Sequence, residues 1–415
     1  MSTVTLQDIE QASVTLRDTI KRTPLERNER LSDQYGAEIF LKREDLQTVR
    51  SYKIRGAYNM MSRLDAASRA KGIVCASAGN HAQGVALSCK LLGIDGHIFM
   101  PRNTPRQKIA RVQTLGEDRV TLDLTGDTFD ETSQVAREYC NKHGKVFVHP
   151  FNDPLVIAGQ ATACVEIFEQ SRKPPEIIVV PIGGGGLVSG VALYTHLKRF
   201  NTRVIGVEPE GGACMSEALR QNRVVTLEKI DTFVDGAALK AVGPLTFEVC
   251  SKLLRDCLKV PEGQVCSELI ELYQRDGIIA EPAGALSVAA LPQIAGDIKG
   301  KSVVCIISGG NNDISRYPEI IERSLVHRGL KHYFLIEFPQ RAGALRRYLD
   351  EALGPNDDIT LFEYVKKSNR EFGPAIVGVE LANRNDLEPL LKRMDAIGLS
   401  YELIDRSSPM FRFLV

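Results

Sequence analysis

The sequence predicts an α/β protein, with parallel sheets covered by helices on both faces, that ends in a small α+β module. Apolar strand-like runs alternate with helix-like stretches over most of the 415 residues, which is the pattern of βαβ units. Three of these runs lead into turns rich in serine, glycine or asparagine. Beyond Asn312 the order of elements changes, which indicates a second domain.

Short apolar runs bounded by polar or glycine-containing segments are typical of strands buried on both faces. The expected strands are Glu38–Leu41, Gly72–Ser77, Gly96–Pro101, Arg119–Leu124, Lys145–Pro150, Glu176–Pro181, Arg203–Glu208 and Ser302–Ser308. Helices are expected between them, including Arg55–Leu64, Asn80–Leu92 and Thr128–His143. We therefore expect one large domain over residues 1–325.

The C-terminal segment predicts a ferredoxin-like module. A helix over Tyr317–Leu325 and a linker over residues 326–330 precede it. Its strands are expected at Lys331–Pro339, Asp358–Tyr364, Ala375–Glu380 and Ser400–Ile404, with one helix that begins at Arg341 and another over Asn385–Ala396. This βαββα order with a closing strand fits a ferredoxin-like fold, so we expect a domain over residues 331–405.

Composition and charge exclude several classes of function. The 52 basic residues balance 52 acidic ones, so no net field attracts nucleic acid or an anionic membrane. No apolar run approaches the roughly 18 residues of a membrane helix, and the N-terminus has no apolar core that would indicate a signal peptide. The nine cysteines form no Cys-x-x-Cys pair, which predicts reduced thiols in a cytoplasmic protein, without a disulfide framework or a zinc site.

A run of four glycines is the most informative local feature. Gly183, Gly184, Gly185 and Gly186 follow the apolar run Ile177–Pro181, and Leu187 then begins a helix. Each ordered glycine costs roughly 0.5–1 kcal/mol relative to alanine. Bare N–H groups at a strand–glycine–helix junction favour a bound anion, typically phosphate. We prefer this interpretation to the alternative, a flexible surface turn.

The glycines do not fit the common nucleotide-binding loops. The dinucleotide fingerprint needs glycines at i, i+2 and i+5, but its third position falls on Val188 or Ser189. Glu208, at the end of the next strand, still resembles a ribose-binding acid and keeps a nicotinamide site open. The Walker-like segment 296–302 is one residue too short and precedes a strand instead of following one.

Three further motifs accompany the glycines in a fixed order. They are Ser-Tyr-Lys-Ile-Arg-Gly-Ala at 51–57, Ser-Ala-Gly-Asn-His-Ala-Gln-Gly-Val-Ala at 77–86 and Ser-Gly-Gly-Asn at 308–311. From about Thr23 to the C-terminus, the chain resembles the fold type II (β-family) pyridoxal-phosphate enzymes and, within them, the biosynthetic threonine dehydratases. The resemblance implies a two-lobed catalytic domain, with a small lobe at about 54–155 inserted in a large lobe.

The resemblance also assigns residues to the cofactor, pyridoxal 5'-phosphate. Lys53 is expected to bond to the pyridoxal aldehyde and then to act as base for the substrate α-proton, with Lys42 as the competing lysine. Gly183–Leu187 should hold the phosphate. Asn80 should bind the ring 3-hydroxyl, with an ordinary helix cap as the open alternative. Ser308 should face the pyridine nitrogen.

The substrate carboxylate is expected at the loop after the second strand. The residues of this loop are Ser77, Ala78, Gly79, Asn80 and His81. Ala78 stands where the similar serine racemases carry an acid/base serine, so racemisation is not expected, and His81 is expected to be structural. Glu208 matches a metal ligand of those racemases, but Cys214 replaces their aspartate, so no metal is expected. Glu281 looks like part of the pocket wall.

These assignments imply a lyase. A hydroxyl at Ser308 leaves the pyridine nitrogen neutral, which favours β-elimination over transamination. The implied reaction is deamination of L-threonine to 2-oxobutanoate and ammonia, the first step of isoleucine biosynthesis. L-serine is implied as a second substrate. Two alternatives stay open, a β-replacement enzyme such as threonine synthase and a nicotinamide oxidoreductase.

The C-terminal module resembles the single ACT-like regulatory domain of threonine dehydratases, especially at Pro339–Leu345. The resemblance implies isoleucine as inhibitor and valine as activator. ACT-like modules usually pair their open sheet with that of a neighbour, so a homodimer or homotetramer is also implied. The alternative is a domain that only holds subunits together.

Overall fold

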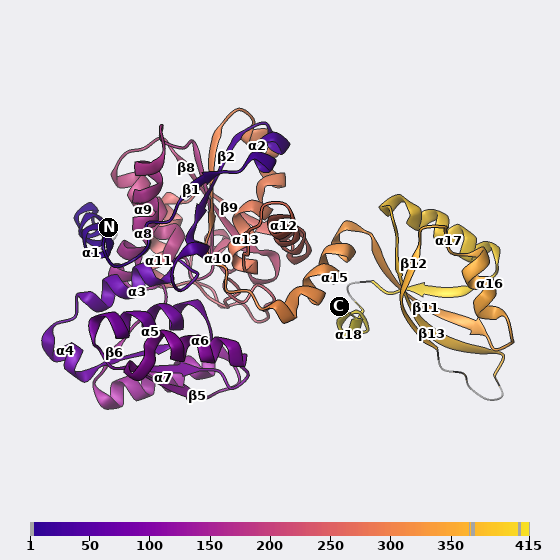
Figure 1. Cartoon of the computed structure of the whole chain (residues 1–415), viewed down its shortest axis with the longest axis horizontal. Helices are drawn as coiled ribbons and strands as arrows, with labels where there is room; N and C mark the ends of the chain where they lie inside the picture. Colours follow the sequence, from indigo (N-terminus) through magenta and orange to yellow (C-terminus); the bar gives the residue numbers. More distant parts are fainter. Residues whose placement is uncertain (1–3, 365, 367–369, 406–407, 415) are drawn as a thin grey trace. The chain divides into compact units, whose positions relative to one another are not determined.

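A computed structural model of the chain (Figure 1) describes residues 4–364, 366, 370–405 and 408–414. It consists of two compact units, Met1–Asp313 and Ile314–Val415, each with its own sheet or sheets. Residues 1–3 of the first expected domain, and 365 and 367–369 of the second, lie outside the described residues. The predicted fold class is confirmed. No helix in the described ranges is long and apolar enough to cross a membrane.

The large lobe of the first unit is built on a six-stranded sheet with the order β1–β2–β10–β7–β8–β9. Its strands are β1 Leu25–Arg27, β2 Glu38–Arg43, β7 Ile177–Pro181, β8 Arg203–Pro209, β9 Asp256–Val260 and β10 Ser302–Ile307. Neighbouring strands are parallel, except that β1 pairs antiparallel with β2. All residues of β7 are buried, as expected for a strand covered on both faces.

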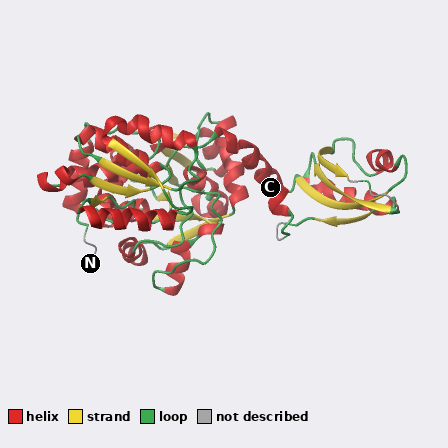
Figure 2. Ribbon diagram, turned by 90° about the horizontal axis from the view of Figure 1, so that it is seen from below, coloured by secondary structure: helices red, strands yellow, loops and turns green. Residues whose placement is uncertain are grey.

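Helices cover both faces of this sheet (Figure 2). On one face, Ile178 and Val180 share an apolar core with α8 Pro154–Gln170 and α9 Gly186–Leu197. On the other face lies α13 Pro282–Ala289, where Ser287 Oγ donates a hydrogen bond to the Ile306 carbonyl. The remaining helices of the lobe are α1 Leu6–Leu16, α2 Glu29–Tyr35, α10 Cys214–Gln221, α11 Pro244–Leu253, α12 Glu262–Gln274 and α14 Ala295–Ile298.

A four-stranded parallel sheet, β5–β4–β3–β6, forms the small lobe. Its elements are α3 Lys53–Ser62, α4 Ala66–Lys71, β3 Ile73–Ala76, α5 Asn80–Leu92, β4 Gly96–Met100, α6 Arg106–Gly116, β5 Val120–Leu124, α7 Phe129–His143 and β6 Val146–Phe147. Ile73 and Cys75 pack in a core with α3 and α5, whereas Val74 and Ala76 pack against α7. This alternation buries both faces of β3.

The second unit contains an antiparallel sheet with the order β12–β13–β11–β14. Its elements are α15 Tyr317–Arg328, β11 Lys331–Pro339, α16 Ala344–Glu351, β12 Asp358–Tyr364, β13 Phe372–Glu380, α17 Leu387–Ala396, β14 Ser400–Leu403 and α18 Phe411–Leu414. Phe334, Ile336 and Phe338 alternate along β11 and pack in a core with α16 and α17. The predicted βαββα order with a closing strand is confirmed.

Besides shifts at element ends, such as the shortening of the expected strand Lys145–Pro150 to β6 and the start of α16 at Ala344 instead of Arg341, three details differ from the sequence-based expectation. β1 and β9 were not expected, because β1 has only three residues, two of them charged, and β9 is mostly half-buried. Residues 326–328, expected in a linker, form the last turn of α15. His327 and Arg328 favour the negative end of the helix dipole, and the helix ends where Gly329 adopts φ 70°. The domain boundaries given above stay a prediction.

The carboxyl ends of three strands lead to one place in the first unit. β3 is followed by Ser77, β7 by the loop that begins at Gly183, and β10 by Ser308. All three residues line a single cavity. Parallel α/β sheets bind their ligands at the carboxyl ends of strands, so both lobes point their ligand-binding edges at this cavity.

Candidate active site

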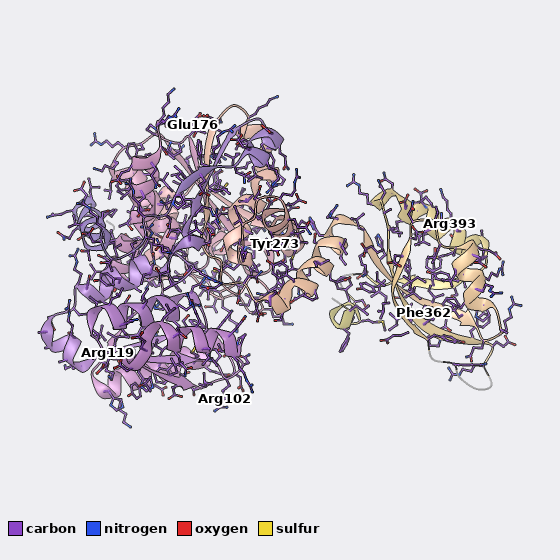
Figure 3. All side chains as sticks on the ribbon, in the orientation of Figure 1. Arg102, Arg119, Glu176, Tyr273, Phe362 and Arg393 are labelled. Carbon is purple, nitrogen blue, oxygen red and sulfur yellow. The ribbon has the colours of Figure 1, made fainter. Side chains whose placement is uncertain are left out.

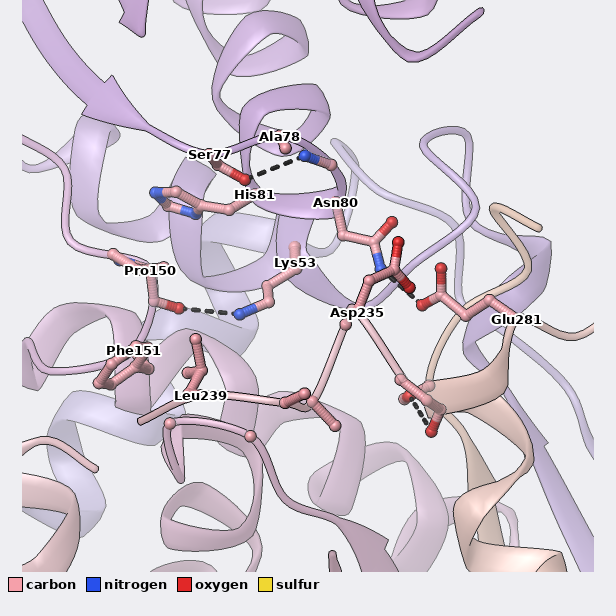
Figure 4. Close-up of a pocket in the computed structure, with 18 of the residues that line it drawn as sticks. Lys53, Ser77, Ala78, Asn80, His81, Pro150, Phe151, Asp235, Leu239 and Glu281 are labelled. Atoms are coloured by element: carbon pink, nitrogen blue, oxygen red, sulfur yellow. Dashed lines mark hydrogen bonds between the residues drawn. The ribbon is translucent and has the colours of Figure 1, made fainter. Parts of the chain in front are cut away.

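A cavity of about 270 Å³ lies between the two lobes (Figure 4). The residues predicted to hold a cofactor or substrate that line it are Lys53, Ser77, Ala78, Gly79, Asn80, His81, Gly183, Gly184, Gly186 and Ser308. Two predicted residues do not line it: Leu187 is buried in the core of the large lobe, and Gly185 lies against Met215 and Thr246. Segments far apart in the sequence therefore meet here.

Lys53 is the first residue of α3 and reaches into the cavity. Its Nζ donates a hydrogen bond of 3.1 Å to the Pro150 carbonyl (Figure 4). Burial lowers the pKa of Lys53 to about 8, against a smaller opposite effect of Glu281. A buried amine with such a pKa is partly neutral near physiological pH, which a nucleophile or base requires.

Lys42, the competing lysine, is placed elsewhere. Its fully buried Nζ lies 2.6 Å from a carboxylate oxygen of Glu166 and 2.7 Å from the Thr23 carbonyl. It does not line the cavity. Of the two candidate lysines, only Lys53 lines the cavity, so Lys53 is the one placed for chemistry.

Arg55 anchors the helix that carries Lys53. Its guanidinium is fully buried and donates to Glu44 at 2.7 and 2.8 Å and to Glu166 at 2.7 and 2.9 Å. These carboxylates belong to the segment after β2 and to α8. The ion pairs therefore fix the start of α3 against the large lobe, two residues from Lys53.

The glycine loop has the form of an anion cradle. Gly185 has φ 91° and caps the N-terminus of α9, whose hydrogen-bond ladder begins with Ser189 N–H and the Gly185 carbonyl. The N–H groups of residues 186–188 precede that ladder. A Cβ at Gly184 would lie 2.3 Å from the Phe151 ring, so a side chain there would displace the loop. The loop thus fits a phosphate group held by backbone N–H groups.

Asn80 does not act as a helix cap. Gly79 is the N-cap of α5, without a side-chain cap bond, and Asn80 is its first residue. Asn80 Nδ2 donates to Glu281 Oε1 at 2.5 Å, and Asn80 Oδ1 accepts from Asn311 Nδ2 at 2.7 Å. The amide is therefore held across the cavity by a second element, which orients it toward a ligand.

Glu281 is the buried acid of this site. It is 5% exposed. Burial raises its pKa to about 7, helped by the charge of Asp235 and opposed by the hydrogen bond from Asn80. Its protonation thus changes near neutral pH. From the sequence, the Glu-Pro-Ala-Gly segment could be placed only in the pocket wall. The raised pKa of Glu281 could not be predicted, because it depends on burial.

Ser308 and the lysine segment are joined directly. The Tyr52 N–H donates to the Ser308 carbonyl at 3.1 Å, and Ser51 forms a bridge with Gly309. Ser308 Oγ donates to the Ala283 carbonyl at 3.3 Å. Because this contact is long, a better acceptor in the cavity can compete for the hydroxyl proton.

The loop before α5 carries no general base. His81 Nε2 lies 2.9 Å from the Val148 carbonyl, which only accepts, and burial lowers the pKa of His81 to about 3. His81 is therefore neutral and fixes the loop. Ser77 Oγ accepts from the Gly79 N–H at 3.2 Å (Figure 4), and Ala78 has no group that transfers protons.

Glu208 has a structural role, because its carboxylate accepts hydrogen bonds from the protein itself. Its carboxylate accepts from the Met215 N–H, the Ser216 N–H and Ser216 Oγ, each at 2.7 Å. It therefore binds the N-terminus of α10. Within the described ranges no cluster of three or more metal-ligating side chains was found.

The sequence missed two residues of the site. Phe151 packs against the glycine loop, and Lys108 pairs with Asp235 at 2.6 Å where both line the cavity. Phe151 could have been predicted from its position after a strand of the small lobe, because loops at the carboxyl edge of a parallel sheet bind ligands. The Lys108–Asp235 pair joins residues 127 apart in the sequence and left no local pattern.

A lysine whose pKa is lowered to about 8 thus lines the same cavity as a strand–glycine–helix phosphate cradle, an asparagine and a serine. These features define a fold type II pyridoxal-phosphate enzyme, and the residues present fit that cofactor.

Comparisons with known proteins agree. Residues 16–309 match the family model described as pyridoxal-phosphate dependent enzyme, and residues 322–414 match the C-terminal regulatory domain of threonine dehydratase. The chain is 51% identical over 414 residues to the biosynthetic L-threonine dehydratase of Bacillus subtilis, covering 100% of this chain and 98% of that one. It is 50% identical to the corresponding protein of Mycobacterium tuberculosis, covering 98% and 95%.

A solved structure of threonine deaminase isoform 2 from Solanum lycopersicum is also similar, with a TM-score of 0.72 and 39% identity over 78% of this chain and 96% of that one. The chain belongs to the biosynthetic L-threonine dehydratases. The resemblance, the lyase class and the cofactor predicted from the sequence are confirmed, and the nicotinamide alternative is wrong.

Proposed function

We propose that this lyase deaminates L-threonine to 2-oxobutanoate and ammonia with Lys53 as its catalytic base, as the first step of isoleucine biosynthesis. The observation that carries the proposal is the placement of the Lys53 amine, with a pKa of about 8, in the cavity lined by the glycine loop and residues 77–81. L-serine, which has the same β-hydroxyl, is the second substrate.

Residues of both lobes would hold the cofactor. Gly183–Leu187 would bind its phosphate through backbone N–H groups, Asn80 would bind its 3-hydroxyl and Ser308 would face its ring nitrogen. In the absence of substrate, Lys53 would bond to its aldehyde. When bound, pyridoxal phosphate supplies an electron sink for the substrate α-carbon.

Lys53 moves the proton of the substrate α-carbon. Its neutral amine accepts that proton, and the Pro150 carbonyl, 3.1 Å from Nζ, orients it. Because burial keeps its pKa near 8, the amine can both take up and release a proton near neutral pH.

Residues Ser77–His81 bind the substrate carboxylate. They precede or begin α5, whose N-terminus favours an anion. Ala78 lies on this loop and cannot deliver a proton to the substrate. The chain therefore eliminates the β-hydroxyl without racemising the substrate.

Steady-state assays test this function. The enzyme loaded with pyridoxal phosphate should release 2-oxobutanoate from L-threonine and leave phosphohomoserine unchanged. Lys53→Ala should lower kcat by roughly a hundredfold or more, because a positioned acid/base contributes about 10²–10⁴-fold. Lys90→Ala is the control, since Lys90 forms an exposed pair with Glu117. Turnover of phosphohomoserine with inert threonine would support a threonine synthase instead.

Regulation is assigned to the second unit. We infer that isoleucine inhibits and valine activates the enzyme through the region that matches the regulatory domain of threonine dehydratase. Exposed apolar residues on its elements, including Leu345, Leu349 and Leu403, support assembly into a homodimer or homotetramer.

We place the enzyme in the cytoplasm. None of the nine cysteines is in a disulfide, and eight of them are buried. Free thiols persist in a reducing compartment. Fractionation of cells that express the protein would test this location.

A further inference from the structure

A second, smaller cavity lies beside the candidate active site. It has a volume of about 180 Å³ and is lined by residues from the loop after β2, α5, α6 and the loop after β10, namely Arg50, Gln83, Gln107, Lys108, Arg111, Asn311 and Asn312. Two of these residues, Lys108 and Asn311, also line the first cavity.

The wall of this cavity is basic. Three of its residues are cationic, and none of those lining it in the described part of the chain is acidic. Lys108 is paired with Asp235 at 2.6 Å, but Arg111 donates only to the neutral Thr48 carbonyl at 3.0 Å. Arg50 is exposed and makes no side-chain hydrogen bond or ion pair with a described residue. Two guanidinium groups thus lack a carboxylate partner.

Buried polar atoms of the same wall also lack partners. Gln83 is 1% exposed, and its Oε1 makes no hydrogen bond with any described residue; the same holds for Oδ1 and Nδ2 of Asn312. Buried polar groups are normally satisfied, so each such atom needs an explanation. Two acceptors and one donor, beside two guanidinium groups that have no carboxylate partner among the described residues, match a ligand that carries both an oxyanion and hydroxyl groups.

We propose that this cavity binds a phosphorylated small metabolite. The guanidinium groups of Arg50 and Arg111 hold the phosphate, because their planar donors match its oxygens. The amides of Gln83 and Asn312 pair with hydroxyl groups of the same molecule. This site is separate from the glycine loop, which is reserved for the cofactor phosphate.

The position of the cavity connects it to the reaction. Asn311 lies in both walls, and its Nδ2 donates to Asn80 Oδ1 at 2.7 Å and to the Val49 carbonyl at 2.9 Å. Asn80 in turn donates to Glu281. A ligand that shifts Asn311 therefore shifts Asn80, so occupancy changes the KM for threonine. This coupling rests on the proposed function, whereas binding itself does not.

Calorimetric titration of the cofactor-loaded enzyme tests binding. The probes are inorganic phosphate and ribose 5-phosphate at constant ionic strength, and saturating pyridoxal phosphate keeps the glycine loop occupied. Both probes should bind once per chain. Ribose 5-phosphate should bind more tightly, because its hydroxyl groups satisfy the buried amides.

Two variants remove charge without disturbing the backbone. Arg50→Asn suits the left-handed φ of 53° at this position, and Arg111→Gln keeps a donor for the Thr48 carbonyl. Each should weaken both probes by about tenfold or more, since a charged hydrogen bond is lost. Neither should change threonine kinetics in the absence of a probe by more than about twofold.

Arg102→Gln is the matched control. Arg102 is an exposed arginine of the small lobe that lines neither cavity (Figure 3). Its removal should leave binding unchanged. The proposal is overturned if neither probe binds, if Arg50→Asn and Arg111→Gln bind as tightly as the parent, or if Arg102→Gln weakens binding equally. A change in threonine KM without calorimetric binding would also overturn it.

Discussion

At the scale of single residues, the site depends on burial more than on residue type. Lys42 is fully buried and Lys53 is half-buried; the amine of Lys42 meets a carboxylate, whereas that of Lys53 meets only a carbonyl. Burial lowers the pKa of the first lysine, but the carboxylates of Glu44 and Glu166 oppose this shift and hold its amine in place. Desolvation leaves the second with a pKa of about 8, because its ammonium form has lost water without gaining a counter-ion.

The titration of Lys53 gives the first prediction. In cofactor-free enzyme, acetylation by acetic anhydride needs the neutral amine, so the labelling rate of Lys53 should rise with pH through a midpoint near 8. The sign follows from burial, which disfavours the charged form and lowers the pKa. Mass spectrometry of the labelled peptides measures the rate, with the exposed Lys392 as reference. A midpoint equal to that of Lys392 would contradict the account.

The residues of the site differ in how far the sequence could predict them. Lys53, Asn80 and Ser308 lie in motifs whose order along the chain is specific, and all three line the cavity. The contact of Asn80 with Glu281 joins residues 201 apart and depends on how the lobes pack. The pKa of Glu281 depends on the same packing, so the sequence contained no signal for it.

At the scale of elements, strand prediction succeeded where burial is uniform. β7 and β10 are continuous apolar runs with buried interiors. Few structures other than a buried strand fit such a short run. β9 mixes two charged residues with three apolar ones and is mostly half-buried, a pattern that is also found in loops. The end of α15 was misplaced because Val326, His327 and Arg328 do not break a helix, whereas Gly329 does.

The buried pairs of Arg55 give the second prediction. Arg55→Met should lower the free energy of unfolding by about 3–5 kcal/mol, because it leaves Glu44 buried without its partner. Urea unfolding of the cofactor-free enzyme measures this. Arg22→Gln is the control: Arg22 pairs with Glu169 on the surface, and the change should cost under about 1 kcal/mol. Equal losses in the two variants would refute the anchoring role of Arg55.

The Lys108–Asp235 pair links α6 of the small lobe to a loop of the large lobe beside the cavity. Because the pair is partly exposed, Asp235→Asn should change stability by under about 1 kcal/mol. It should nevertheless raise the KM for threonine roughly two- to fivefold, since the lobes lose a contact that closes the site. Asp95→Asn removes the surface pair with Arg119 and serves as control. An unchanged KM in Asp235→Asn would exclude this role.

At the scale of the whole molecule, the chain combines a catalytic unit with a regulatory one. The second unit has its own core. Each unit is therefore expected to fold separately.

Truncation tests whether catalysis and the response to isoleucine belong to different units. A chain that ends at Arg328 should keep threonine turnover and lose its response to isoleucine. A coupling free energy of about 1–3 kcal/mol between effector and substrate sites would change the apparent affinity for threonine roughly 5–150-fold in the full chain. Isoleucine titration of both proteins measures it. If the full chain ignores isoleucine, or if both proteins respond equally, the second unit is not the sensor.

The central claim is that Lys53 carries the chemistry of this enzyme. Borohydride reduction of the cofactor-loaded enzyme, followed by peptide mapping, tests it most directly. The account predicts one stable cofactor label per chain, on the peptide that contains Lys53. A label on Lys42 or on any other lysine, or no label at all, would contradict it.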